Sequence, residues 1–133
     1  MSVLLGFDFG THKIGVAVGQ TITGTASPLV TLRAKNGHPD WIGIGKLINT
    51  WIPEALVVGI PYDFDGAEMD WTHQIHRFSR QLSTRFKLPV HQIDECLTSM
   101  EARGLMGRAA KNHESVDAVA ASLILETWLS EQR

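Results

Sequence analysis

The chain opens with short apolar runs separated by polar turns, and their spacing predicts three strands. Residues 3–9 form a near-continuous apolar run, which is typical of a buried strand. Residues 14–19 alternate branched apolar side chains with glycine and alanine, which predicts a second strand paired with the first as a hairpin. Residues 23–32 are rich in Thr and Val and predict a third strand. Pro28 favours a sheet edge for this strand, because proline cannot donate a hydrogen bond to a strand ladder.

The middle of the chain alternates helix and strand patterns. Apolar residues recur at helical spacing in residues 40–51 and again in residues 68–86. A short apolar run follows each of these segments, at residues 55–60 and 88–93, and each run predicts a buried strand. Antiparallel strands followed by strand–helix alternation indicate an α/β fold in which helices cover a mixed sheet. The first helix is expected to direct inward Trp41, Ile44, Leu47, Ile48 and Trp51.

Helix signals dominate the C-terminal part of the chain. Thr98, with Glu101 three residues later, forms a capping box that predicts the start of a helix. Residues 104–113 are predicted to form a loop, and Ser115 is predicted to cap a last helix. The apolar stripe of that helix is expected at Val116, Val119, Ala120, Leu123, Ile124 and Trp128. Neither a repeat nor a linker interrupts the pattern, so residues 1–133 are expected to form a single domain.

Composition narrows the class of protein. The chain has 133 residues, of which 44% are hydrophobic, and this suits one globular domain with a real core. Its one cysteine, Cys96, cannot form an internal disulfide, and neither a signal peptide nor a membrane span is evident, so we expect a cytoplasmic protein. The net charge of −2 argues against binding nucleic acid by bulk electrostatics, but not against an enzyme that meets phosphate through a bound metal.

Three carboxylates stand out against the pattern of strands and helices. Asp8 lies inside the first apolar run, where an unpaired charge is costly to bury unless a cation compensates it; alternatively, it caps the turn after the strand. Glu95 follows a predicted strand, where functional side chains often collect, although a solvated loop carboxylate would look the same and Asp94 competes for the role. Asp117 lies in the first turn of the last helix, where the helix dipole alone also favours an acid.

The three carboxylates can converge if the first strand is central in the sheet. Grouped carboxylates repel each other and raise one another's pKa values, and hard divalent cations remove this conflict by binding the oxygens. Two such ions can activate water and stabilise the leaving oxygen in phosphodiester hydrolysis. Asp8, Glu95 and Asp117 are therefore predicted to hold one or two Mg²⁺ or Mn²⁺ ions in a metal-dependent nuclease.

Four short motifs occur in order along almost the whole chain. They comprise residues 7–11 with 14–17, 58–61 with 65–66, 94–95 with 97–98 and 101–102, and 116–117 with 120–121. These motifs resemble those of the YqgF/RuvX family. The resemblance implies an RNase H-like fold with a mixed five-stranded sheet, its first three strands antiparallel and the others parallel, flanked by helices on both faces. It also implies that the carboxylate triad of the family maps onto Asp8, Glu95 and Asp117.

The resemblance further implies a nuclease that matures the 5′ end of pre-16S ribosomal RNA in the bacterial cytoplasm, as part of ribosome biogenesis. An alternative within the family is a Holliday junction resolvase that acts on four-way DNA. The chain departs from the family at two places. Cys96 stands where members usually carry Arg, and the lysine-poor segment 111–115 stands where members tend to have more lysines. Both departures remove positive charge near the expected phosphate.

Basic and hydroxyl side chains supply candidate contacts to a nucleic-acid substrate. The predicted contacts are Thr11, Lys13, Thr98, Arg103, Arg108 and Lys111. His73, His76, Arg77 and Arg80 share one face of the helix predicted at residues 68–86, and this face is either an RNA contact or simply solvated.

Two other classes of protein remain open. The opening Asp8–Thr11 also resembles the phosphate-binding hairpin of the actin and hexokinase superfamily, which would indicate a kinase fragment. A non-catalytic module that binds RNA or a ribosome-assembly partner would share the same fold. We expect a monomer or a weak homodimer, because only a junction resolvase would need a symmetric pair to cut two strands.

Overall fold

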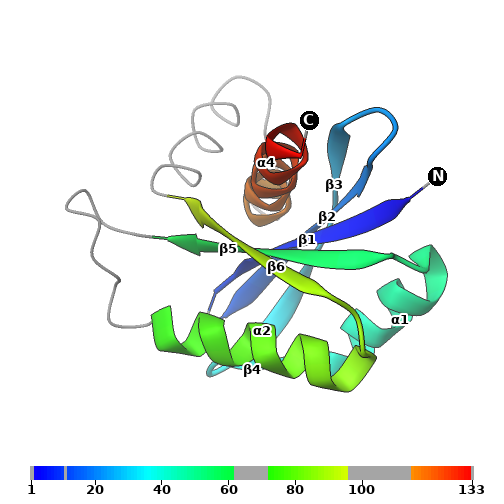
Figure 1. Ribbon diagram of the computed structural model, residues 1–133. Helices are drawn as coiled ribbons and strands as arrows, with labels where there is room; N and C mark the ends of the chain where they lie inside the picture. Colours follow the sequence, from blue (N-terminus) through cyan, green and yellow to red (C-terminus); the bar gives the residue numbers. More distant parts are fainter. Residues whose placement is uncertain (1, 11, 62–71, 96–114, 133) are drawn as a thin grey trace.

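A computed structural model of the chain describes residues 2–10, 12–61, 72–95 and 115–132 (Figure 1). Its elements, in chain order, are β1 (Val3–Phe9), β2 (Lys13–Gln20), β3 (Thr25–Lys35), β4 (His38–Pro39), α1 (Trp41–Trp51), β5 (Ala55–Pro61), α2 (Thr72–Phe86), β6 (Val90–Glu95) and α4 (Ser115–Glu131). In the described part of the chain, no helix is long and apolar enough to cross a membrane. The helix predicted to begin at Thr98 and the loop at residues 104–113 lie outside the described residues.

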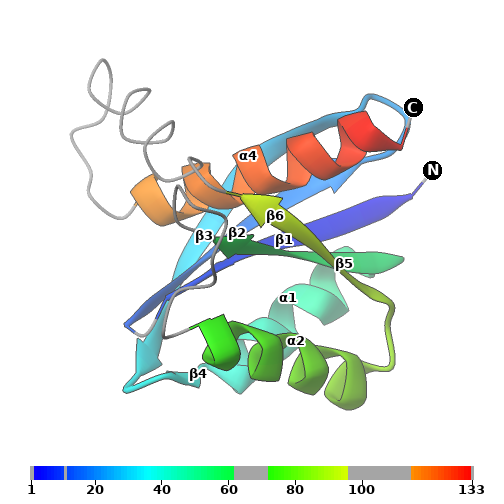
Figure 2. The same cartoon turned by 60° about the vertical axis from the view of Figure 1, so that its left-hand side comes forward.

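The strands form one mixed sheet in the order β4-β3-β2-β1-β5-β6. β1, β2, β3 and β4 pair antiparallel, whereas β1, β5 and β6 run parallel. The predicted mixed sheet of five strands is confirmed, and the structure adds the two-residue β4, which pairs with the end of β3. β1 is central, and the carboxyl ends of β1, β5 and β6 lie at the same end of the sheet (Figure 2).

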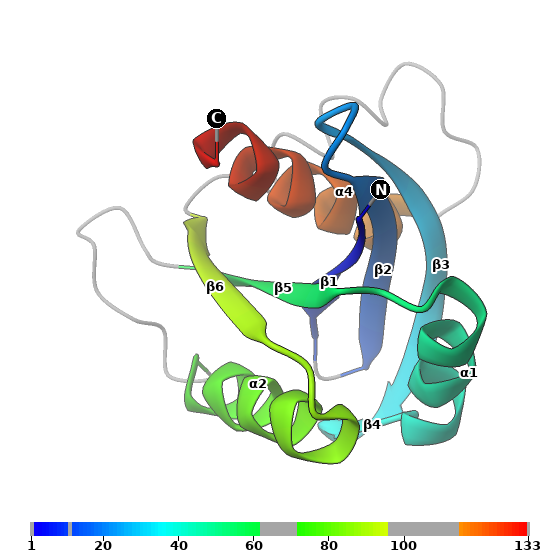
Figure 3. The same cartoon turned by 45° about the vertical axis from the view of Figure 1, so that its right-hand side comes forward.

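The sheet separates two layers of helix. α1 and α2 cover one face and α4 covers the other, as predicted for helices on both faces (Figure 3). Pro28 lies in β3, whose outer side pairs, among the described residues, only through Ala34 and Lys35 with β4. The prediction that Pro28 marks a sheet edge is therefore confirmed.

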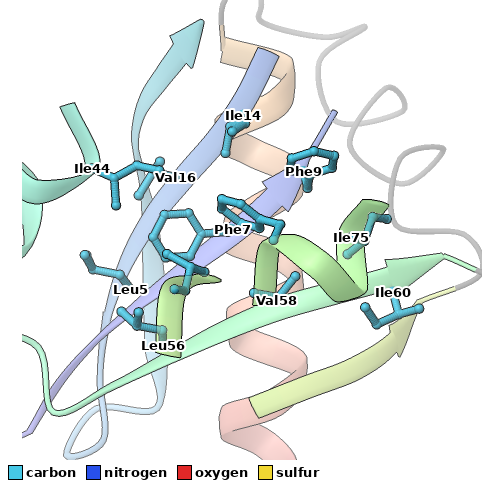
Figure 4. Close-up of a cluster of buried hydrophobic side chains, with 12 residues drawn as sticks. Leu5, Phe7, Phe9, Ile14, Val16, Ile44, Leu56, Val58, Ile60 and Ile75 are labelled. Atoms are coloured by element: carbon cyan, nitrogen blue, oxygen red, sulfur yellow. The ribbon is translucent and has the colours of Figure 1, made fainter. Parts of the chain in front are cut away.

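The face under α1 and α2 is filled with large side chains. Leu5, Phe7 and Phe9 of β1 alternate toward this face, together with Ile14 and Val16 of β2 (Figure 4). Phe78 of α2 makes an edge-on contact with the ring of Phe7, with 5.7 Å between the centroids, and its centroid lies 4.9 Å from that of Phe9. Aromatic pairs at such distances add to the free energy gained by burying their area. This cluster is the main core of the molecule.

α1 begins and ends as its sequence predicts, but one of its predicted core residues is exposed. The side chain of Asp40 accepts a hydrogen bond from the backbone N–H of Gly43 at 3.0 Å, which caps the helix N-terminus. Ile44 is fully buried, and Trp41 stacks on Phe78. The prediction that Trp51 packs inward is wrong, because 36% of its surface is exposed. Trp51 is the last residue of the helix, so the core ends before it.

The opposite face carries a second hydrophobic cluster, with Leu4, Val57 and Ile93, and several glycines onto which α4 packs closely. A Cβ atom on Gly6 would lie 2.9 Å from the Cβ of Leu125, and one on Gly19 would lie 2.8 Å from Cδ2 of the same side chain. A Cβ on Gly59 would lie 2.5 Å from Cδ1 of Ile124. Real Cβ atoms essentially never approach so closely. The glycines of three strands therefore allow the helix to lie almost directly on the backbone of the sheet.

The predicted inward stripe of α4 is partly wrong. Ala120 and Ile124 are buried as predicted, and the predicted Trp128 packs on the cluster under α4 and stacks on His91 of β6. Val119 and Leu123 are only half-buried, and the side chain of Val116 lies outside the described set. The buried stripe also includes Ala118, Ala121, Leu125 and Leu129. Apolar residues occur on nearly every side of this helix, so helical spacing alone could not tell which side faces the sheet.

Candidate active site

Asp8 lies near the end of the central strand, on the face that α4 covers. In β1, Leu5, Phe7 and Phe9 belong to the core under α1 and α2, so the alternating residues Gly6 and Asp8 face α4. Asp8 pairs with Gly15 of β2 across the antiparallel ladder. The side chain is half-buried, as its place in an apolar run predicts.

Asp117 reaches the same place from the other end of the sequence. It lies in the first turn of α4, where the helix dipole favours a negative charge. The cross-strand partner of Asp8 explains how the helix gets so near. A Cβ atom on Gly15 would overlap the backbone carbonyl of Asp117 and would lie 2.8 Å from the N of Ala118. The missing side chain of Gly15 thus makes room for the helix start beside Asp8.

The two carboxyl groups interact electrostatically. Burial, and secondly the negative charge of Asp117, raise the pKa of Asp8 from 3.8 to about 7. Burial also raises the pKa of Asp117, while the positive charge of Lys13 lowers it. Each carboxyl group is therefore harder to ionise than a solvated aspartate. Without a cation, this pair resists carrying two negative charges near neutral pH.

Glu95 and Asp94 end β6, at the same end of the sheet as Asp8. Glu95 pairs with Pro61 of β5 through its backbone, and its side chain lies outside the described set. Asp94 is exposed and alternates with Ile93, which packs in the cluster under α4. Gln92, which shares the side of Asp94, hydrogen-bonds to His76 of α2 at 3.3 Å. Asp94 therefore belongs to the face opposite Asp8.

Among the predicted substrate contacts, only Lys13 falls within the described residues. It is exposed at the start of β2, and its charge acts on Asp117. Thr11, Thr98, Arg103, Arg108 and Lys111 lie outside the described residues. Arg77 and Arg80 on α2 are exposed, which suits either a solvated face or an RNA contact. In the described ranges, no group of three His, Cys, Asp or Glu residues could hold a metal ion.

A family match decides the class of this chain. A sequence model described as RuvX, Holliday junction resolvase, matches residues 2–131. The chain belongs to the RuvX family. A protein of Azotobacter vinelandii is 48% identical over 134 residues, which cover 98% of this chain and 94% of the relative. One from Legionella pneumophila is 50% identical over 97% of this chain and 96% of its own length. Both carry the name "Putative pre-16S rRNA nuclease".

Solved structures confirm the RNase H-like fold of this RuvX member. Thermus thermophilus RuvC, in complex with a Holliday junction substrate, superposes with a TM-score of 0.58 at 17% identity and covers 99% of this chain and 96% of its own. Fowlpox virus resolvase, also in complex with Holliday junction DNA, superposes with a TM-score of 0.59 at 8% identity over 98% of both chains. At such low identity, the likeness concerns the fold alone.

The sequence analysis did not single out one residue that shapes the site. Gly15 carries no chemistry, but it sets how closely α4 approaches Asp8. The signal was present in β2, where Gly15, Ala17 and Gly19 alternate with branched side chains. A strand face made only of small residues indicates that another backbone packs against it.

Proposed function

We propose that this RuvX member is a metal-dependent nuclease whose metal ligands are Asp8, Glu95 and Asp117. The observation that carries the proposal is the coupled pair Asp8 and Asp117, two carboxyls from opposite ends of the chain beside each other at the end of the central strand. Protein folds rarely keep such a pair without a compensating cation. The third ligand in the proposal is Glu95, at the end of the parallel strand β6.

The chemistry of these groups fits a hard divalent cation. Carboxylate oxygens are the ligands that Mg²⁺ and Mn²⁺ prefer. Burial and the charge of Asp117 raise the pKa of Asp8, and a bound cation would offset both effects. One or two bound ions would supply a nucleophile from water at neutral pH and stabilise the leaving oxygen. The chain itself supplies rigid positions for the ligands, because Asp8 lies in a central strand and Asp117 in a helix packed on glycine.

Lys13 is the proposed first contact to the substrate. It is exposed, and its charge already reaches Asp117 in the metal-free protein. A lysine ammonium binds phosphate as a point charge, and here it would orient the phosphodiester beside the carboxylates. The other proposed contacts are Thr11, Thr98, Arg103, Arg108 and Lys111.

The proposed substrate is precursor 16S ribosomal RNA, in the bacterial cytoplasm. Relatives that are 48–50% identical over nearly the whole chain carry the name of a nuclease for this RNA. The same match favours a nuclease over the kinase-fragment interpretation. Trimming one RNA strand needs no symmetric partner, so the proposal is compatible with a monomer or a weak homodimer, whereas a four-way DNA junction would require a pair of active sites.

The test is cleavage of precursor 16S rRNA and of a four-way DNA junction, each with Mg²⁺, Mn²⁺ or EDTA. We expect cleavage of the RNA only with metal, and its loss in Asp8→Asn, Glu95→Gln and Asp117→Asn. Preferential cleavage of the junction would instead identify a resolvase. Equal cleavage by the wild type and all three variants would point to a contaminating nuclease and overturn the proposal.

A further inference from the structure

A basic groove lies beside the carboxylate pair, at the end of the β2–β3 ladder. The groove has a volume of about 350 Å³ and is lined by His12, Lys13, Thr31, Arg33 and Ala34. Three of these residues can carry positive charge, and none is acidic. The backbone N–H of Ala34 donates to the carbonyl of His12 at 2.8 Å, which ties the β1–β2 turn to β3.

The ladder places the groove next to the candidate site. Asp8 pairs with Gly15, and Gly15 pairs with Thr31, so these three residues form one row across the sheet. Lys13 and Arg33 pair with each other two residues further along their strands, which is one step of about 7 Å. Side chains two residues apart on a strand share a face, so Lys13, Thr31 and Arg33 lie on the face of Asp8 and α4.

Lys13 and Arg33 form an unfavourable pair in the protein alone. They are direct cross-strand partners, and like charges in that position repel each other. Among the described residues, neither forms an ion pair with an acidic side chain, and the electrostatic partner of Lys13 is Asp117 across the site. An anion bound between Lys13 and Arg33 would convert this repulsion into two favourable interactions.

We propose that the groove formed by His12, Lys13 and Arg33 is a phosphate-binding subsite that holds the sugar–phosphate backbone of the substrate strand next to the bond to be cut. The inference rests on the proposed function for its link to cleavage, but the binding of nucleic acid in the groove can be tested separately. Arg33 presents a planar fork that suits a phosphate, whereas Lys13 lies between that phosphate and the carboxylates. Contacts of this kind set the register of the strand without reading its sequence.

The test measures binding of a fluorescent single-stranded RNA and of a four-way DNA junction by anisotropy, in EDTA and over a series of salt concentrations. The variants are Arg33→Gln and the double variant Lys13→Gln with Arg33→Gln. The matched control is Lys46→Gln, which removes one exposed positive charge from α1 on the other face of the sheet. Thermal unfolding without nucleic acid checks that each variant is folded.

We expect Arg33→Gln to weaken RNA binding several-fold and to lower the slope of log affinity against log salt by about 1, as for the loss of one phosphate contact. The double variant should bind RNA more weakly than Arg33→Gln does. Lys46→Gln should bind as the wild type does. The melting temperature of Arg33→Gln should rise slightly, because the repulsion with Lys13 is removed. An equal loss for RNA and junction DNA would identify the shared backbone as the ligand, and a loss for one alone would assign the groove to that strand type.

Binding by Arg33→Gln that equals the wild type, or a loss no larger than that of Lys46→Gln, would overturn the inference. If the wild type cleaves neither substrate but still loses RNA binding in Arg33→Gln, the subsite stands and the proposed nuclease activity fails. If metal-dependent cleavage is present but the groove variants bind normally, the nuclease stands and the subsite fails.

Discussion

On the face that α1 and α2 cover, the central strand carries Phe7 and Phe9, whose rings pack on Phe78. On the face that α4 covers, the same strand carries Gly6 and Asp8. The first face is thick, because large rings fill the space between helix and sheet. The second is thin, because glycine and alanine let the helix backbone approach. Both faces bury hydrophobic side chains, but only on the second do the glycines also set the geometry of the site.

The sharpest test of this comparison uses two neighbouring acids at the end of β6. Glu95→Gln should lower the rate of metal-dependent RNA cleavage by at least about a hundredfold, the loss typical of removing a group that stabilises transition-state charge. Asp94→Asn, one residue earlier, should leave the rate unchanged, because Asp94 belongs to the α2 face. Both rates are measured on the same precursor RNA with Mg²⁺. A large loss of cleavage rate in Asp94→Asn would mean that residues on the α2 face also contribute to the site.

Phe78→Ala tests the thick face. Removing a fully packed ring should lower the free energy of unfolding by about 3–5 kcal/mol, because it leaves a cavity against Phe7, Phe9 and Trp41. Urea unfolding measures this loss, and Phe78→Leu should restore part of it. Under conditions in which Phe78→Ala is folded, its Mn²⁺ affinity measured by calorimetry should equal that of the wild type. Weaker metal binding in the folded variant would show that the two faces are coupled.

The pH dependence of stability tests the thin face. The pKa of Asp8 is raised from 3.8 to about 7 in the folded protein, so between these values the folded state holds a proton that the unfolded state releases. The free energy of unfolding of the metal-free protein should therefore fall as pH rises from about 4 to about 7, by an amount on the order of 2–4 kcal/mol.

Urea unfolding in EDTA at pH 5 and pH 8 measures this slope. Asp8→Asn should flatten the slope and should be more stable than the wild type at pH 8, because it carries no charge to bury. Asp94→Asn is the control and should keep the slope. A wild type that is as stable at pH 8 as at pH 5 would contradict the description of Asp8 as a carboxyl that resists ionisation.

Gly15→Ala tests how much the close approach of α4 matters. The added methyl group would overlap the backbone of Asp117, so the helix start must shift, at a cost of about 1–3 kcal/mol in the free energy of unfolding. The shift moves Asp117 away from Asp8, and Mn²⁺ binding should weaken. Val16→Ala, the next residue of β2 and part of the other face, should also destabilise the protein but leave Mn²⁺ binding unchanged. Equal metal binding in both variants would show that the position of α4 tolerates the shift.

The sequence alone determined most of the fold. Strand alternation in residues 3–9 and 14–19 and helical spacing in residues 40–51 and 68–86 depend on neighbours a few residues away, and such patterns are readable along the chain. Pro28 marked an edge strand for an equally local reason. Asp8, Glu95 and Asp117 stood out against the same pattern, and the family resemblance pointed to the same three residues.

Only the tertiary structure decided which side of α4 faces the sheet, that Asp94 lies on the face opposite Asp8, and that Lys13 lies opposite Arg33. These facts depend on register and on packing between elements distant in sequence, and a pattern that is apolar on all sides cannot encode them. The same holds for Gly15. Its importance comes from a helix that begins 100 residues later, at Ser115, and packs where a side chain would have stood.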